Sequence, residues 1–364
     1  MNQTALFSNM LHPQGYGKVT TMTHTLRFSL FTVLIGAILF TLVGCGAEQG
    51  SSEQGSSEQG SSSEDAPEES MPPASEPAGR VVEVGNEPEG IVADSETGLV
   101  AVGLREPGQL ALVDGSSGEV IRNVDLPESP RHLGIAGPGG PVLVPAESAD
   151  TLVQVSLPEG EIIAETPVGT SPHDAAAAPN GRIFVGNELG DNASVVEGDS
   201  EVEMIETARQ PGGVAVTDDG LVGIVSVGEL VLEVFDASTL DSLGRADAGE
   251  GPTHIVAGPE NRFYVTDTTG DAVLIYEARP EPEQVNSVSL PGQPYGIAID
   301  PEHGHLWVTI EESLVQFALE GDTLREIARY PTVSKPNTVA VDTASGRVFV
   351  ADRANGELQI LDPQ

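Results

Sequence analysis

Short apolar stretches recur at a nearly constant interval along most of the chain. A proline opens each of seven copies, and successive prolines are 42, 42, 39, 41, 42 and 42 residues apart. After the proline come an apolar stretch, a turn that contains glycine, a stretch rich in β-branched and aromatic residues, and a third stretch that often ends in aspartate. Short apolar runs bounded by turn residues predict strands. The chain contains no long stretch with the 3.6-residue apolar period of a helix, so we predict no helical domain. The seven prolines are Pro88, Pro130, Pro172, Pro211, Pro252, Pro294 and Pro336.

The length of the repeat predicts the fold. A period near forty residues with three or four short strands per copy is typical of a β-propeller blade. We therefore predict an all-β, seven-bladed β-propeller over residues 80–364. The last copy ends after three strands, whereas residues 80–84 (RVVEV) form an apolar stretch with no partner in the first copy. We predict that this N-terminal strand pairs with the last blade and closes the ring.

Two of the copies resemble known propeller repeats. Residues 172–173 with 181–187 (GRIFVGN) resemble the YVTN repeat, with Asp174 where that pattern usually has glycine. Residues 350–355 with 358–362 resemble the NHL repeat. The resemblance extends from about residue 80 to the C-terminus and implies a propeller of the YVTN/NHL type. Such propellers include scaffolds, binding proteins, lactonases and lyases, so the resemblance leaves the activity open.

The N-terminal segment resembles the signal of a bacterial lipoprotein. Residues 28–44 carry no charge and are mostly apolar, which is short for a membrane span of about 20 residues and suits a secretory signal. The run ends in LVGC, which resembles a lipobox and implies cleavage before Cys45, the only cysteine, and lipid attachment to it. The true start of this signal could be Met22. We expect an exported protein, anchored through this lipid to the outer side of the cytoplasmic membrane or to the cell envelope.

Residues 45–79 separate this anchor from the repeats. Three tandem EQGSS copies begin at Glu48, and a stretch rich in Pro, Glu, Ser and Ala follows. Between Cys45 and residue 79 the only large apolar residue is Met71, so burial cannot offset the entropy of ordering this segment. We expect a disordered acidic tether.

The acidic excess of the chain limits the classes of partner that it can bind. Asp and Glu number 56 against 16 Lys and Arg, and the signal removes only two basic residues, which takes the formal charge from −40 to −42. Nucleic acids and anionic lipid surfaces are bound through basic residues, so we expect neither as a direct partner. The acidity favours either attraction of cations or solubility in a salty exterior, as in a halophilic source. We expect a monomer.

The resemblance to propellers also indicates where a site lies. In these folds the loops into the innermost strands and the loops out of the second strands open on one face, around a central channel. Three of the seven histidines and several carboxylates fall in these loops. The candidates are Arg131, His132, His173, Asp174, His254, Tyr295 and Asn337 in the first loops, and Glu147, Asn187, Asp267, Glu311 and Asp352 in the second.

These side chains allow three interpretations. Histidine and carboxylate groups together can bind a divalent metal such as Ca, Mg or Zn. A histidine near a carboxylate can instead act as a general base, with His132 and His254 as the catalytic candidates. Polar residues also line channel mouths without any such role. We predict a binding or scaffold module for a small molecule, metal or protein partner, with a metal-dependent lactonase or lyase as the alternative.

The lyase alternative has some sequence support. Residues 252–259 with 263–267 resemble blades of streptogramin lyases, a resemblance that implies a histidine pair with a metal. The pattern departs at Ile310, where an acidic residue is expected, and Glu311 comes one position late. Such an enzyme needs the candidate histidines close to one another or to a carboxylate. For His254 this requires reaching across the channel.

Overall fold

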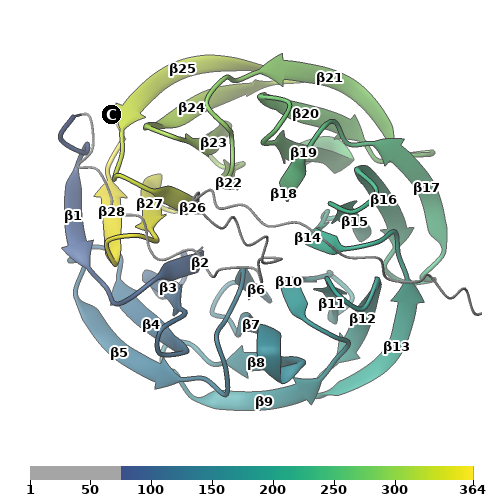
Figure 1. Cartoon of the computed structure of the whole chain (residues 1–364), viewed down its shortest axis with the longest axis horizontal. Coiled ribbons are helices and arrows are strands. Elements are labelled where there is room, and N and C mark those ends of the chain that lie inside the picture. Colours follow the sequence, from purple (N-terminus) through teal and green to yellow (C-terminus); the bar gives the residue numbers. More distant parts are fainter. Residues whose placement is uncertain (1–74, 364) are drawn as a thin grey trace, which may run out of the picture. The chain divides into compact units, whose positions relative to one another are not determined.

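The computed structural model describes residues 75–363, which form a ring of seven four-stranded antiparallel sheets (Figure 1). This is the predicted seven-bladed β-propeller. Within each blade the strands run from the central channel to the rim in chain order, except in the last blade. The innermost strands are β2 (Pro88–Asp94), β6 (Gly134–Ile135), β10 (Pro172–Ala177), β14 (Pro211–Val216), β18 (Pro252–Gly258), β22 (Ile297–Asp300) and β26 (Pro336–Asp342).

The second and third strands contain the fully buried apolar stretches. The second strands are β3 (Leu99–Leu104), β7 (Val142–Ala146), β11 (Arg182–Asn187), β15 (Leu221–Ser226), β19 (Arg262–Asp267), β23 (His305–Ile310) and β27 (Arg347–Asp352). The third strands are β4 (Gln109–Asp114), β8 (Thr151–Val155), β12 (Asn192–Glu197), β16 (Val231–Asp236), β20 (Ala272–Glu277), β24 (Ser313–Glu320) and β28 (Glu357–Leu361).

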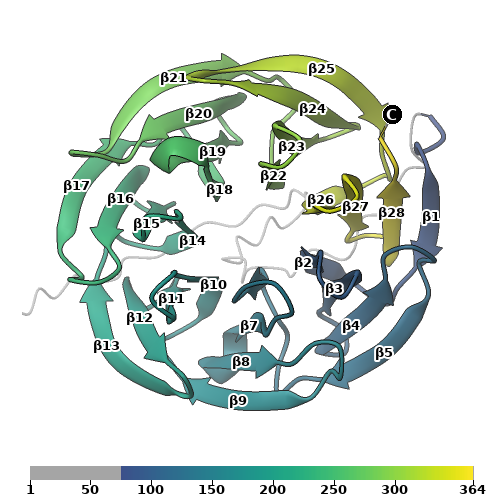
Figure 2. The same ribbon diagram turned by 180° about the vertical axis from the view of Figure 1, so that it is seen from behind.

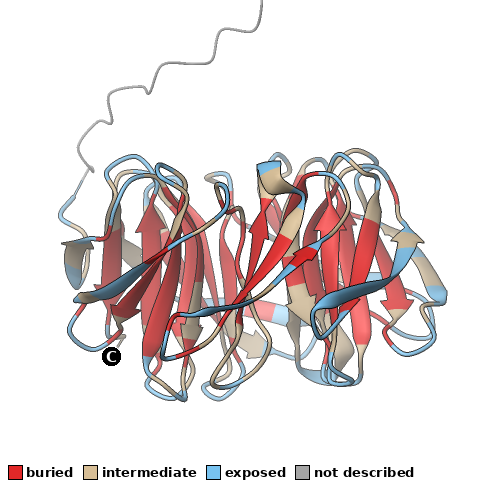
Figure 3. Ribbon diagram, turned by 90° about the horizontal axis from the view of Figure 1, so that it is seen from below, coloured by how far each residue is buried: buried red, intermediate tan, exposed pale blue. Residues whose placement is uncertain are grey.

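The outer strands are largely exposed (Figure 3). They are β5 (Val120–Asp125), β9 (Ile162–Pro167), β13 (Ser200–Glu206), β17 (Ser242–Asp247), β21 (Glu283–Ser289), β25 (Thr323–Pro331) and β1 (Arg80–Glu83). Two short 3₁₀ turns, Glu147–Ala149 and Pro259–Asn261, are the helical elements of the described residues. No helix in residues 75–363 has the length and apolar character needed to cross a bilayer.

The N-terminal strand closes the ring as predicted. β1 pairs antiparallel with β28 on the outside of the last blade, with Arg80 opposite Ile360 (Figures 1 and 2). The strand ends at Glu83, one residue before its predicted end, and the Val84 N–H then donates to the Gly356 carbonyl oxygen at 2.9 Å. The Arg80 guanidinium also donates to the Ser117 carbonyl oxygen in the first blade at 2.9 Å. The last blade is thereby tied to the first.

The hydrophobic core lies between neighbouring blades. Trp307 of β23 is fully buried and packs with Val339 and Val350 of the last blade. Phe263 packs against Gly223 of the preceding blade, where a Cβ atom would lie 2.9 Å from the phenyl ring. Contacts of this density around a closed ring hold the innermost strands in place, and those strands carry the candidate site. The predicted signal, Cys45 and most of the tether lie outside the described residues.

Candidate functional site

The seven repeat prolines mark one face of the ring. Pro88 at the start of β2 pairs with Leu104 at the end of β3, and Pro172 likewise pairs with Asn187. The loops into the innermost strands and out of the second strands therefore meet on the same face. The residues directly after the prolines form an upper level around the channel, and the next residues a lower level. The upper level is Glu89, Arg131, His173, Gly212, Thr253, Tyr295 and Asn337, and the lower is Gly90, His132, Asp174, Gly213, His254, Gly296 and Thr338.

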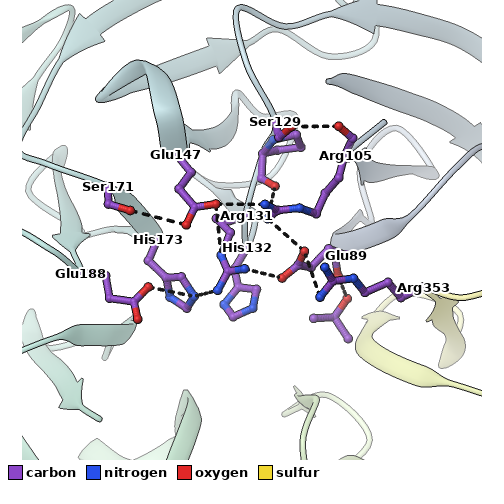
Figure 4. Close-up of polar contacts among 12 residues, drawn as sticks. Glu89, Arg105, Ser129, Arg131, His132, Glu147, Ser171, His173, Glu188 and Arg353 are labelled. Atoms are coloured by element: carbon purple, nitrogen blue, oxygen red, sulfur yellow. Dashed lines mark hydrogen bonds and ion pairs between the residues drawn. The ribbon is translucent and has the colours of Figure 1, made fainter. Parts of the chain in front are cut away.

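A buried glutamate forms the centre of an ion-pair cluster at the mouth (Figure 4). The Glu89 side chain is 1% exposed, and three arginines approach it. Arg105 Nη1 donates to Glu89 Oε2 at 3.1 Å, and Arg353 Nη1 lies 3.7 Å from the same oxygen. Arg131 Nη1 is 3.1 Å from Oε1, although not aligned for a hydrogen bond. A buried carboxylate is stable only with such partners.

A second glutamate links the same arginines. Arg105 Nη2 donates to Glu147 Oε2 at 3.1 Å, while Arg131 Nε lies 3.8 Å from that oxygen, beyond hydrogen-bond distance. With Glu188 near His173, the ion-pair cluster contains three carboxylates and three guanidinium groups. Its charge is therefore balanced, in contrast to the formal charge of −40 for the whole chain.

His173 is a neutral imidazole in this cluster. Arg131 Nη2 lies 2.7 Å from His173 Nε2, and because arginine can only donate, Nε2 accepts. The remaining ring nitrogen, Nδ1, then carries the proton and donates to the Gly212 carbonyl oxygen. This tautomer is assigned from the hydrogen-bond partners. Burial, followed by the charge of Arg131, lowers the pKa of His173.

Four aromatic rings form a row across the channel. The His132 ring centroid lies 4.5 Å from that of His173 and 4.3 Å from that of His254, and His254 lies 4.5 Å from Tyr295. His132 Nε2 and His254 Nε2 are 3.0 Å apart. One of these nitrogens must donate and the other accept, so at least one ring is neutral and a single proton lies along this contact. We call His173, His132, His254 and Tyr295 the ring row.

Burial explains the protonation of the ring row. Burial lowers the pKa of His254 to about 3 and lowers that of His132 well below its usual value. Burial also raises the pKa of the Tyr295 hydroxyl, with Glu89 the next contribution in the same direction. The histidines therefore remain uncharged at neutral pH. Of the three, only the histidine that donates in the contact between His132 and His254 keeps a lone pair without a partner, on its Nδ1.

Unpartnered polar atoms gather at this mouth. Within residues 75–363, eight buried side-chain nitrogen or oxygen atoms have no hydrogen-bond partner. Five of them belong to the two levels around the channel: Glu89 Oε1, Arg131 Nε, His132 Nδ1, His254 Nδ1 and Asn337 Oδ1. Buried polar groups are nearly always satisfied in folded proteins, and functional sites are the usual exception. The concentration at one place indicates a site that a ligand or water completes.

Asp174 lies apart from the ion pairs. Its Oδ2 accepts the Val214 N–H at 2.9 Å and its Oδ1 the Ala175 N–H at 2.8 Å. Burial nevertheless raises the pKa of this carboxyl to about 7. The side chain keeps partial access to the channel while protein surrounds it. Asp174 is thus a carboxyl that changes charge near neutral pH.

Several other predicted site residues hold turns. Asn187 Nδ2 donates to Asn192 Oδ1 and Ser194 Oγ. Asp267 accepts the backbone N–H groups of residues 250, 251 and 270, and Asp352 accepts that of residue 354. Glu311 is exposed in the turn after β23. The structure brings His132, His173, His254 and Tyr295 together, and the Asn337 side chain is buried at the level of His173 and Tyr295.

The sequence-based choice missed four charged residues: Glu89, Arg105, Glu188 and Arg353. Arg105, Glu188 and Arg353 each follow directly after the last residue of a second strand, as Glu147 does. In two blades the sequence analysis chose the last residue of the second strand, Asn187 or Asp352, instead of the residue that follows it. Side chains alternate along a strand, so this shift selects the residue that faces the turn. Reading the position after every proline would have found Glu89.

The donors for a metal are few. Across residues 75–363, no three His, Cys, Asp or Glu side chains are grouped so that they could hold a metal ion. His132 and His254 could supply two nitrogens, and further ligands would have to come from solvent or a bound molecule. A divalent metal stays a prediction from the sequence.

Comparison with known proteins identifies the fold but no family or activity. No family model matches the sequence, and no curated protein is similar to it at the sequence level. Solved structures do match. A chain of the hydrazine synthase of Kuenenia stuttgartiensis has a TM-score of 0.66 at 15% identity, over 76% of this chain and 96% of its own. Streptogramin B lyase has a TM-score of 0.65 at 16% identity, over 77% and 97% of the two chains. A chain of the mitotic checkpoint complex reaches 0.69 at 13% identity, over 82% and 96%.

Proposed function

We propose that this protein is a membrane-anchored binding module that holds a small polar molecule at the mouth of its propeller. The observation that carries the proposal is the gathering of unpartnered buried atoms around Glu89, Arg131 and the ring row. The mouth offers guanidinium donors together with carboxylate and imidazole acceptors. A ligand with both acceptor and donor groups, such as a zwitterion, suits this balance better than a simple anion or cation. The fixed ion pairs favour a preformed site.

Arg353 is the mouth residue best suited to a test. Its side chain is 45% exposed, and its approach to Glu89 is the longest of the three at 3.7 Å, so its replacement should leave the fold intact. The matched control is Arg325 on the outer strand β25, which forms an exposed pair with Glu320 at the end of β24.

The experiment is native mass spectrometry of the full chain after incubation with a small-molecule extract of the producing cells. We expect one discrete adduct with the unmodified chain and with Arg325→Ala, and its loss with Arg353→Ala. The proposal fails if the unmodified chain retains no adduct, or if Arg353→Ala retains the same one.

A lactonase or lyase is the second candidate, favoured by the 3.0 Å contact between His132 and His254. This contact meets the geometric requirement for an enzyme, because one imidazole nitrogen is free of its proton and could serve as a general base. One neighbour of the fold, at 16% identity, is an inactive virginiamycin B lyase from Staphylococcus aureus solved with quinupristin.

The test is incubation with quinupristin and with a simple lactone, with and without Mg²⁺. An enzyme would consume one of them, and His132→Ala and His254→Ala would each abolish the turnover. No consumption under either condition would leave the binding module alone.

A further inference from the structure

A cavity of about 400 Å³ follows the axis of the ring beneath the ring row. The innermost strands of all seven blades line it. Apart from His132, Asp174, His254 and Thr338, every lining residue is glycine, alanine, valine, leucine or isoleucine. A volume of this size with mostly apolar walls and a few polar groups is typical of small-molecule sites.

The polar side chains that line the cavity all lie at one end. His132, Asp174, His254 and Thr338 occupy the lower level of the mouth, two residues after their prolines. Neither His173 nor Tyr295 lines the cavity, and neither does Glu89 or Arg131. The cavity therefore lies on the opposite side of the ring row from the ion-pair cluster.

The apolar walls continue away from the mouth. The lining reaches Ala177 and Val216, the last residues of β10 and β14, and Val341, next to last in β26. These ends lie at the face opposite the prolines (Figure 2 shows the ring from behind Figure 1). A ligand would reach the cavity from that face, because the ring row crosses the channel toward the mouth.

The polar end has hydrogen-bonding capacity that the protein leaves unused. His132 is 5% exposed, and its Nδ1 has no partner. Each Asp174 oxygen accepts one backbone N–H and retains a second lone pair. No lysine or arginine lines the cavity, so nothing compensates the charge of an anionic ligand there. The head group that fits is a neutral or cationic hydrogen-bond donor.

We propose that this cavity is a second ligand site, which takes a small apolar molecule with one hydroxyl or amine head group. The head donates to Asp174 at the closed end, beside His132, and the apolar body lies among the alanine and branched side chains toward the far face. The site does not rest on the ligand proposed for the mouth, because the two lie on opposite sides of the ring row, although His132 and His254 border both.

The probes are N-phenyl-1-naphthylamine, which fluoresces in apolar surroundings and carries one N–H donor, and two competitors of the same ring system. With the full chain we expect a saturable rise in fluorescence. 1-Naphthol should displace the probe, whereas 1-naphthoate, with an anionic head, should do so at least tenfold less well. The absence of a saturable rise would mean that the cavity holds only water and would overturn the proposal.

Variants locate the binding. Ala177→Phe and Ala257→Phe add a phenyl ring at two half-buried lining positions in different blades. Both alanines also contact the core between blades, so circular dichroism must show that a variant is folded, and one folded variant suffices. Either should weaken probe binding at least tenfold, whereas Ala344→Phe, in an exposed turn, should not. Arg353→Ala at the mouth should also leave probe binding unchanged. Unaltered binding in a folded cavity-filling variant, or loss of binding in Arg353→Ala, would contradict the proposal.

Discussion

His132 Nε2 and His254 Nε2 lie 3.0 Å apart although 122 residues separate them in the chain. They come from the second and fifth blades, so the contact spans the channel and joins opposite sides of the ring. Both imidazoles are neutral in this arrangement. Protonation of both would place two positive charges side by side in a buried position, which is why the contact should respond to pH.

Acidification should therefore destabilise the protein through these histidines. The pKa of His254 is lowered to about 3 in the folded state, whereas an unfolded histidine titrates near 6.5. Its stabilising contribution is complete above about pH 6.5 and is lost as pH falls toward 3, by at most about 1.4 kcal/mol per pH unit. Urea unfolding between pH 7.5 and 4 should show a steeper loss for the unmodified chain than for His254→Gln. Equal slopes would contradict the assignment.

Asp174 should have the opposite effect on the pH dependence of stability. Its folded pKa of about 7 lies above the unfolded value near 3.8, so the folded state retains the proton between these pH values. The contribution of Asp174 to stability falls as pH rises from about 4 to 7 and is then constant. Relative to the unmodified chain, Asp174→Asn should be more favourable at pH 8 than at pH 5. The exposed control Asp199→Asn should show no such difference, and a matching difference would count against the prediction.

Glu89→Gln should be among the most destabilising substitutions at the mouth. It keeps the size of the side chain but leaves Arg105 and Arg131 without their buried carboxylate. Breaking a buried ion pair in this way costs about 3–5 kcal/mol. The control is Glu326→Gln, whose pair with Arg329 is exposed, and it should cost less than about 1 kcal/mol. Chemical denaturation measures both, and similar losses would show that the Glu89 cluster is not structurally important.

The closing strand β1 should contribute far more to stability than the segment that precedes it. Deletion of residues 80–83 removes the outer strand of the last blade and exposes the edge of β28. Deletion of residues 46–74 removes most of the predicted tether, which spans residues 45–79. We expect a large fall in melting temperature for the first deletion and no measurable change for the second. Equal melting temperatures would argue that the ring closes without β1.

Cys45→Ser tests the predicted lipid anchor. The substitution should move the protein out of the membrane fraction or leave an uncleaved precursor. Mass spectrometry of the N-terminus should find the acyl chains on Cys45 of the unmodified chain. An unmodified cysteine there would end this part of the account.

The sequence predicts the architecture well because each repeat is one blade. The spacing of Pro88 and its six counterparts set the blade number, and the unpaired stretch at residues 80–84 identified the closing strand. The site was accessible only in part. The first loops correctly indicated His132, His173, His254 and Tyr295 as neighbours of one channel. The contact of His132 with His254 depends on the radius of the ring and on side-chain orientation, which no local pattern encodes.

The charged cluster was harder to predict for a different reason. Glu89 is paired with arginines from the second-strand loops of its own blade and of the last blade, so its partners become apparent only when the ring is closed. Asp267 and Asp352 looked equally suitable in sequence, yet they bind backbone N–H groups in their own turns. A carboxylate at a strand end can serve either purpose, and a shift of one residue decides which.

The central claim is that the mouth, with its ring row, is a preformed site for a small polar ligand. The most direct test is ¹⁵N NMR of the full chain labelled at histidine, during titration with the small-molecule extract of the producing cells. His303 and His305 serve as internal controls, since they lie at the β22–β23 turn on the opposite face. The account predicts neutral signals for His132, His173 and His254 at pH 7, and shifts of these signals alone on ligand addition. Charged imidazoles at the mouth, or shifts confined to His303 and His305, would contradict it.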